Sequence, residues 1–358
     1  MARTVRGGLV TAPVLALAVV GGQPAGADEI EVVASIKPLH SLVAGVMQGV
    51  GEPVLLVKGA SSPHSYQLRP SEALALDQAR VVFWIGERLE TFLVKPLAAL
   101  SSDATIVELS KAPGVELLAT REGGMWDEHE EHADDNEHAD EADAEHEEHE
   151  QEHAEAEHAD EAHAEDEEHA EDEDSEEHAH EHGRFDMHVW LDPHNAEAMV
   201  GAIVAALSEA DPDNAAAYES NGGRLRARLQ ELDESVRNEL QPVRDRPFVV
   251  FHDAYHYFED RYRLNAVGSI SVDPGRRPGA QRLGEIQHRL EELDAACVFA
   301  EPQFEPALVD TVIEGTSARK GVLDPLGADL DAGPDQYFRL IDRLADSLRD
   351  CLGAPKSG

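Results

Sequence analysis

The sequence predicts an α/β protein of two lobes, each with a mainly parallel sheet flanked by helices. Short apolar runs, rich in β-branched residues, alternate with segments of helical periodicity, and the alternation resumes after residue 242. A long amphipathic pattern at 213–241 separates the two halves, and a His- and acid-rich stretch at 127–182 interrupts the first half. The 358 residues suffice for two domains of ordinary size.

The N-terminal segment 1–27 is typical of a secretory signal peptide. Two early arginines precede a short apolar run at 9–20, and Ala25-Gly26-Ala27 is a fitting cleavage site, so the mature chain is expected to begin near Asp28. An uncleaved anchor is less favoured, since the run falls short of the ~20 residues that span a bilayer. The absence of a nearby Cys argues against lipid attachment there. These features predict a soluble, periplasmic protein.

The N-terminal lobe is expected to cover 28–212. Val81-Val82-Phe83-Trp84-Ile85 is a continuous apolar run of the kind that parallel sheets bury. Ser71 is expected to cap a short helix, and Asp192-Pro193 marks another helix start. Strands are predicted at 30–36, 53–58, 81–85 and 105–109, and helices at 39–50, 71–79, 87–100 and 194–209.

The segment 213–241 is predicted to be one long helix linking the lobes. Its apolar residues recur at helical spacing, although Gly222 and Gly223 each cost ~1 kcal/mol relative to Ala. An ordinary surface helix of one lobe fits the pattern nearly as well.

The C-terminal lobe is expected to cover 242–358. It contains both cysteines of the chain, Cys297 and Cys351, and in an oxidising compartment such a pair predicts a disulfide between a strand and the last helix. Strands are predicted at 248–251, 266–270 and 297–300, and helices at 253–262, 279–293, 305–319 and 334–351.

The stretch 127–182 is expected to be a disordered loop. It holds 30 Asp or Glu, no Lys or Arg, and almost nothing larger than Ala to bury. A solvated acidic linker would explain the carboxylates but has no need of imidazoles. A weak, multi-site collector of zinc explains both. Its twelve histidines are His129, His132, His138, His146, His149, His153, His158, His163, His169, His178, His180 and His182.

The net charge of −44 argues against nucleic acid as a partner. Even without the acids of the tract, 43 acidic residues face 29 basic ones, so the rest of the chain stays acidic.

Three histidines outside the tract are candidate metal ligands. His64 follows the second predicted strand, His188 lies between Asp186 and Asp192-Pro193, and His252 directly follows a strand of the second lobe. In open α/β sheets ligands bind beyond the carboxyl ends of strands, where three imidazoles would leave one open position on zinc. Taken singly, each is more often an ordinary surface or hydrogen-bonded residue.

Five motifs follow one another along the mature chain. They are Gly-Ala-Ser-Ser-Pro-His-Ser-Tyr-Gln-Leu-Arg-Pro-Ser at 59–71, Asp-Met-His-Val-Trp-Leu-Asp-Pro at 186–193, Phe-His-Asp-Ala-Tyr at 251–255, Phe-Ala-Glu-Pro-Gln-Phe at 299–304 and Leu-Asp-Pro-Leu-Gly at 323–327. Together they resemble the periplasmic zinc-binding component of a bacterial ABC importer, the ZnuA type. The resemblance covers nearly all of the mature chain in the right order, and an acidic His-rich insertion is itself a feature of that family.

The resemblance implies two lobes joined by one rigid long helix, with Zn²⁺ in the cleft between them. It implies that His64, His188 and His252 are zinc ligands and that Asp324 or water fills the fourth position. Asp324 matches a carboxylate ligand of manganese-binding relatives. Some zinc-binding members have a carboxylate before the first His, where this chain has Pro63. Three imidazoles favour zinc over harder ions. The family's disulfide matches Cys297 and Cys351.

The function so implied is capture of zinc and its delivery to a membrane permease of a zinc ABC importer, without catalysis. Periplasmic zinc chaperones are possible further partners, and a monomer is expected. An extracellular metal buffer or adhesin is the first alternative. A zinc hydrolase, with Glu301 or Asp324 as base, is the second, although the sequence has no His-Glu-x-x-His. Asp253 is expected either to orient a ligand or to cap the following helix.

Overall fold

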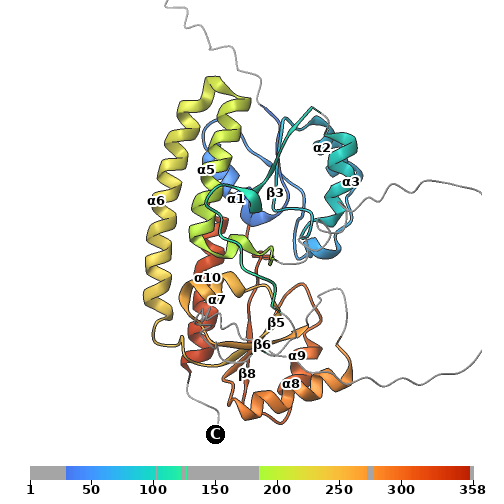
Figure 1. Cartoon of the computed structure of the whole chain (residues 1–358), viewed down its shortest axis with the longest axis vertical. Coiled ribbons are helices and arrows are strands. Elements are labelled where there is room, and N and C mark those ends of the chain that lie inside the picture. The colour runs from blue at the N-terminus through green and yellow to red at the C-terminus, as the bar shows by residue number, and fades with distance from the viewer. Residues whose placement is uncertain (1–29, 102, 122–125, 127–184, 272–277, 355–358) are drawn as a thin grey trace, which may run out of the picture.

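The computed structural model describes residues 30–101, 103–121, 126, 185–271 and 278–354. Their α/β arrangement has two lobes stacked along the long axis of the molecule, each containing one sheet (Figure 1). The predicted signal peptide and the His- and acid-rich tract lie outside the described residues.

The first lobe is built on a four-stranded parallel sheet with the order β2-β1-β3-β4. Alternate residues of the central strands enter opposite cores, so both faces are covered. Helices α1 and α5 cover one face, and α2 and α3 cover the other. The elements are β1 (Val32–Ala34), α1 (Lys37–Val46), β2 (Val54–Leu55), α2 (Pro70–Gln78), β3 (Val81–Trp84), α3 (Thr91–Leu100), β4 (Thr105–Glu108) and α5 (Pro193–Ala210).

All eight elements predicted for the first lobe are present, with shifted ends. The predicted cap of α2 is wrong: the helix begins at Pro70, so Ser71 is already inside it, and Glu72 accepts a hydrogen bond from the backbone N–H of Arg69 at 2.8 Å. At α5 the Asp192 side chain accepts a hydrogen bond from the N–H of His194, which stabilises the predicted start.

The second lobe repeats this strand order in a parallel sheet, β6-β5-β7-β8. Helices α8 and α9 pack on one face, and α7 and α10 contribute to the core on the other. The predicted helix at 305–319 is wrong at its end, because the chain leaves the helix and forms a fourth strand. The elements are β5 (Phe248–His252), α7 (His256–Tyr262), β6 (Ala266–Ser271), α8 (Ala280–Glu292), β7 (Cys297–Ala300), α9 (Ala307–Ile313), β8 (Arg319–Val322) and α10 (Gln336–Gly353).

Two helices connect the lobes. Helix α6 (Ala215–Leu240) runs along one side of both, and α10 packs against α6 and against α1 of the first lobe (Figure 1). The apolar stripe of α6 is buried in a core shared by both sheets. Close packing of α6 on α5 explains the glycine at position 222, since a Cβ there would come within 2.4 Å of a Val204 methyl group. The lobes therefore share one hydrophobic core along this side.

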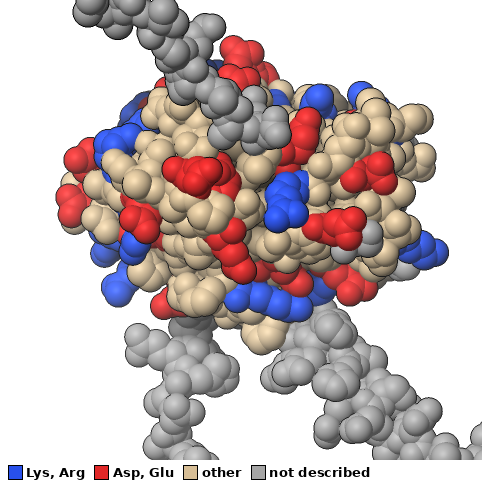
Figure 2. Space-filling model, turned by 90° about the horizontal axis from the view of Figure 1, so that it is seen from above, with Lys and Arg blue, Asp and Glu red and all other residues tan. Residues whose placement is uncertain are grey.

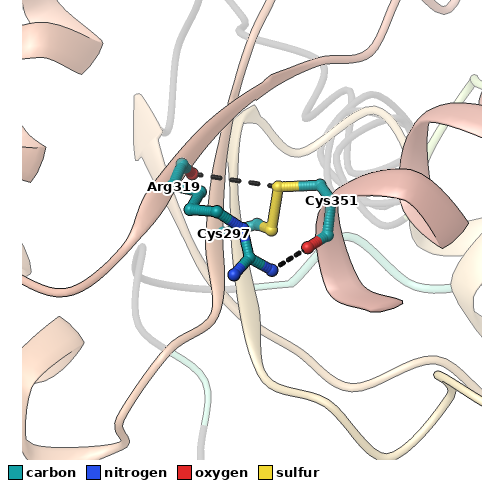
Figure 3. Close-up of a disulfide and its surroundings, with 3 residues drawn as sticks. All are labelled: Cys297, Arg319 and Cys351. Atoms are coloured by element: carbon teal, nitrogen blue, oxygen red, sulfur yellow. Dashed lines mark hydrogen bonds between the residues drawn. A yellow bond between two sulfur atoms is a disulfide. The ribbon is translucent and has the colours of Figure 1, made fainter. Parts of the chain in front are cut away.

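The predicted disulfide between Cys297 and Cys351 is present and joins β7 to α10 (Figure 3). Arg319 donates a hydrogen bond to the Cys351 carbonyl beside it. With a sequence separation of 54 residues, loop closure stabilises the fold by about 4 kcal/mol in the chain-entropy model.

Replacing both cysteines by serine is therefore expected to lower the melting temperature by roughly 10 °C, at about 2–4 °C per kcal/mol. Differential scanning calorimetry of the zinc-free protein checks this. A melting temperature within 2 °C of the unmodified protein would show that the bond contributes little.

Acidic and basic side chains are interspersed over the face of the molecule seen in Figure 2, where the described residues form no continuous patch of one sign. Within the described part of the chain, no helix is both long and apolar enough to cross a membrane.

Candidate metal centre

The three predicted histidines meet where the lobes face each other. His252 is the last residue of β5, beside the point where the strand order of its sheet reverses between β5 and β7. His64 lies in a 3-10 turn (η1, Pro63–Ser65) after β2, and His188 immediately precedes another (η3, Val189–Leu191). Two loops of one lobe and a strand end of the other thus supply the three imidazoles.

Their geometry suits one metal ion. One ring nitrogen of each lies within 4.8 Å of the others, and the Nε2 atoms of His64 and His188 are 3.3 Å apart. The ring centroids are separated by 5.3–5.9 Å. The Nε2 of His252 is buried and has no hydrogen-bond partner among the described residues, so its lone pair is free for a metal.

Two carboxylates fix the orientation of the rings. Asp186 Oδ1 lies 2.7 Å from Nδ1 of His188, and Glu301 Oε1 lies 2.6 Å from Nδ1 of His252. Each carboxylate also accepts the backbone N–H of the histidine that it holds. Because the Nδ1 proton is directed to the carboxylate, Nε2 is left as the metal-binding atom. Neither role was predicted, although both residues fall within the quoted motifs.

Burial and neighbouring charges shift the pKa values of His64 and His252 in opposite directions. Burial and the neighbouring imidazoles lower the pKa of His64 to about 2, so this ring is neutral and ready to bind. Burial alone would lower the pKa of His252, but the charge and hydrogen bond of Glu301 raise it above its usual value. Burial would raise the pKa of Asp186, but His188 lowers it, so this carboxylate is ionised.

Replacing Glu301 by glutamine is expected to weaken metal binding about 10–100-fold, as is usual when an outer partner of a metal-binding imidazole is changed. Gln can keep the shape but loses the charge that orients and polarises His252. Competitive titration of the purified variant measures the change. Glu291→Gln, at an exposed position after the middle of α8, is the matched control; equal affinities of the two variants would mean that Glu301 only fills space.

Asp324 is not part of this group. Its Oδ1 accepts hydrogen bonds from Gln303 Nε2 at 2.8 Å and from the backbone N–H of Leu326 at 3.0 Å, and its Oδ2 accepts one from the N–H of Ala328 at 2.5 Å. The carboxylate is therefore engaged by its own loop and by Gln303, which follows β7.

The Asp253 carboxylate neither bonds to the ring of one of the three histidines nor caps α7, so it has neither of the roles expected from the sequence. Its carboxylate pairs with Arg121, which also binds Glu259 at 2.7 Å. The cap residue of α7 is Tyr255. The Arg121 guanidinium in turn lies 3.5 Å from the ring centre of Trp126. Arg121 thus links the end of the described first-lobe segment to the second lobe.

The remaining described histidines lie apart from the group. His40 contacts the Pro53 carbonyl at 3.0 Å, His194 and His288 are exposed, and His256 begins α7 in a half-buried position. The twelve histidines of the tract lie outside the described residues.

The three imidazoles line two cavities. The residues of the first cavity include Trp190, Gln303 and Phe304. Those of the second include Arg88, Thr120 and Phe185. The histidines therefore lie where the two cavities meet.

Two α/β lobes with matching sheets, a shared helical side and three converging imidazoles define a two-lobed metal-binding protein. The family model described as "Zinc-uptake complex component A periplasmic", ZnuA, matches residues 32–351. The chain belongs to this family.

The similar proteins match this chain over nearly its whole length. A protein of Brucella abortus (strain 2308) named "High-affinity zinc uptake system protein ZnuA" is 51% identical over 90% of this chain and 91% of its own. A protein of the same name from Paracoccus denitrificans is 41% identical over 92% and 94%. A solved structure titled "Crystal structure of ZnuA" covers 91% of this chain and 100% of its own, with a TM-score of 0.67 and 23% identity.

Proposed function

We propose that this protein captures Zn²⁺ between its lobes and delivers it to the membrane permease of an ABC importer. The observation that carries the proposal is the convergence of three imidazole nitrogens from both lobes within 4.8 Å. Membership of the zinc-uptake family and the printed names of the relatives support it.

The proposed ligands are His64, His188 and His252. Three neutral nitrogen donors suit zinc better than harder ions such as Mn²⁺. Water is the proposed fourth ligand, since the Asp324 carboxylate already accepts hydrogen bonds from Gln303 and from its own loop. Affinity falls in acid because the imidazoles must be unprotonated to bind.

Zinc binding is proposed to fix one arrangement of the lobes, because its ligands come from both. A permease can then distinguish the loaded receptor from the empty one by shape. The proposed limits are 28–212 for the N-terminal lobe, 213–241 for the linking helix and 242–358 for the C-terminal lobe. The protein is proposed to act as a monomer, with zinc chaperones as further partners.

Residues 127–182 are proposed to collect zinc at several weak sites and so to raise its concentration near the cleft. Twelve histidines among 30 acidic residues supply the donors. Family membership supports a periplasmic location, and segment 1–27 is proposed as the cleaved signal peptide that brings the chain there.

The hydrolase alternative finds little support in the site. Both candidate bases are already engaged, Glu301 by His252 and Asp324 by Gln303. The buffer or adhesin alternative differs from a receptor in assigning tight binding to the tract.

Growth of a bacterium that lacks its own zinc receptor, but keeps the matching permease, tests the proposal. The protein is expected to restore growth on limiting zinc, whereas His252→Ala is not and the exposed control His288→Ala is. Restoration by His252→Ala would contradict a receptor that works through the cleft.

A further inference from the structure

The loop carrying Asp324 belongs to the second lobe and is held by two residues of the first lobe. The buried Lys37 of the first lobe donates hydrogen bonds to the carbonyls of Gly327 at 3.0 Å, Ala328 at 2.6 Å and Leu330 at 3.0 Å. Trp190 Nε1 donates to the Pro325 carbonyl at 2.8 Å. The backbone around Asp324 is therefore fixed, and only the direction of its side chain decides whether it reaches the metal.

Gln303 is the one side chain in the described part of the structure that donates a hydrogen bond to this carboxylate, at 2.8 Å. The NH₂ group of Gln303 faces Asp324, because it is the donor group of the amide and the carboxylate oxygen accepts the hydrogen bond. The carbonyl oxygen Oε1 consequently points elsewhere. It is buried without a partner among the described residues, and Gln303 lines the same cavity as the three imidazoles. A buried acceptor without a donor costs about 1–3 kcal/mol, which a water or hydroxyl donor would recover.

We propose that Gln303 sets the fourth coordination position of the metal. Its amide nitrogen holds the carboxylate of Asp324 away from the ion, and its carbonyl oxygen accepts a hydrogen bond from the water that completes the site. Gln303 is thus a specificity-determining residue, because it keeps a hard carboxylate out of a site made of three imidazoles. The inference rests on the proposed function, since it needs a metal held by those imidazoles.

The test uses protein lacking 127–182, so that the tract binds none of the added metal. Gln303→Leu removes both hydrogen bonds at similar volume. It is expected to weaken Zn²⁺ binding about 10-fold, to strengthen Mn²⁺ binding by a similar factor and to change the visible absorption of bound Co²⁺. Adding Asp324→Asn to Gln303→Leu is expected to abolish the gain in Mn²⁺ affinity, since the released carboxylate causes it.

Gln281→Leu, an exposed position on α8, is the matched control and should behave as the parent protein. If Gln303→Leu unfolds, Gln303→Ala is measured in its place. A parent-like ratio of Zn²⁺ to Mn²⁺ affinity and a parent-like Co²⁺ spectrum in the Gln303 variant would overturn the proposal. So would a Mn²⁺ gain that survives Asp324→Asn. Failure of the proposed function would give a different result. In that case the His252→Ala variant would bind Zn²⁺ as tightly as the parent protein.

Discussion

Replacing His252 by alanine is expected to weaken tight zinc binding by at least about 100-fold. Zinc bound by four ligands is stabilised by about 10–16 kcal/mol, so each imidazole accounts for roughly 3 kcal/mol. The variant also removes the imidazole that the second lobe supplies to the site, so the remaining ligands come from the first lobe. Glu301 would then remain buried beside an empty space, with no ring to orient.

Competitive titration against a strong chelator measures this loss. His288→Ala is the matched control, since that side chain is 73% exposed on α8. Near-ultraviolet circular dichroism of both variants verifies that the fold is kept. A dissociation constant for His252→Ala within threefold of that of the control would show that tight zinc binding does not depend on the cleft.

Zinc is expected to raise the melting temperature of protein lacking 127–182 by roughly 10 °C when free zinc exceeds the dissociation constant about 1,000-fold. Binding to the folded state alone then contributes ~4 kcal/mol, at about 2–4 °C per kcal/mol. Because the ligands come from both lobes, hydrogen exchange should slow in both the His64 loop and the end of β5.

Calorimetry and hydrogen-exchange mass spectrometry with and without zinc measure the two effects. The His252→Ala variant is the control and should show neither. Identical exchange and small-angle scattering profiles in the two states would mean that zinc does not tie the lobes together, and that a permease must recognise the loaded receptor by other means.

The sequence predicted the elements whose pattern has a direct physical cause. The apolar run at 81–85 became a strand covered on both faces, and Leu225 and Leu229 became part of the buried stripe of α6. Strand β8 was missed because its burial alternates only between half-buried and exposed positions, which leaves little apolar periodicity. Local pattern is weakest at such an edge strand.

The site was predictable in part. The sequence places His64, His188 and His252 at strand ends or in loops, which suggested that they lie at the edges of the sheets. The family resemblance then indicated that all three bind one metal ion. The roles of Asp186 and Glu301 depend on contacts across 2 and 49 residues, and that of Lys37 on contacts across about 290. No periodicity encodes such contacts. The contacts of Asp253 with Arg121 and of Asp324 with Gln303 also come from other segments of the chain, so no local pattern indicates them.

A competitive zinc titration of the mature protein and of a variant lacking 127–182 tests the central claim most directly. We expect one tight site to survive removal of the tract, with only weak binding lost. Adding His64→Ala or His252→Ala to the shortened protein is expected to abolish the tight site. Loss of all tight binding together with the tract would contradict the claim, and would identify the protein as a metal buffer whose converging imidazoles do not hold zinc.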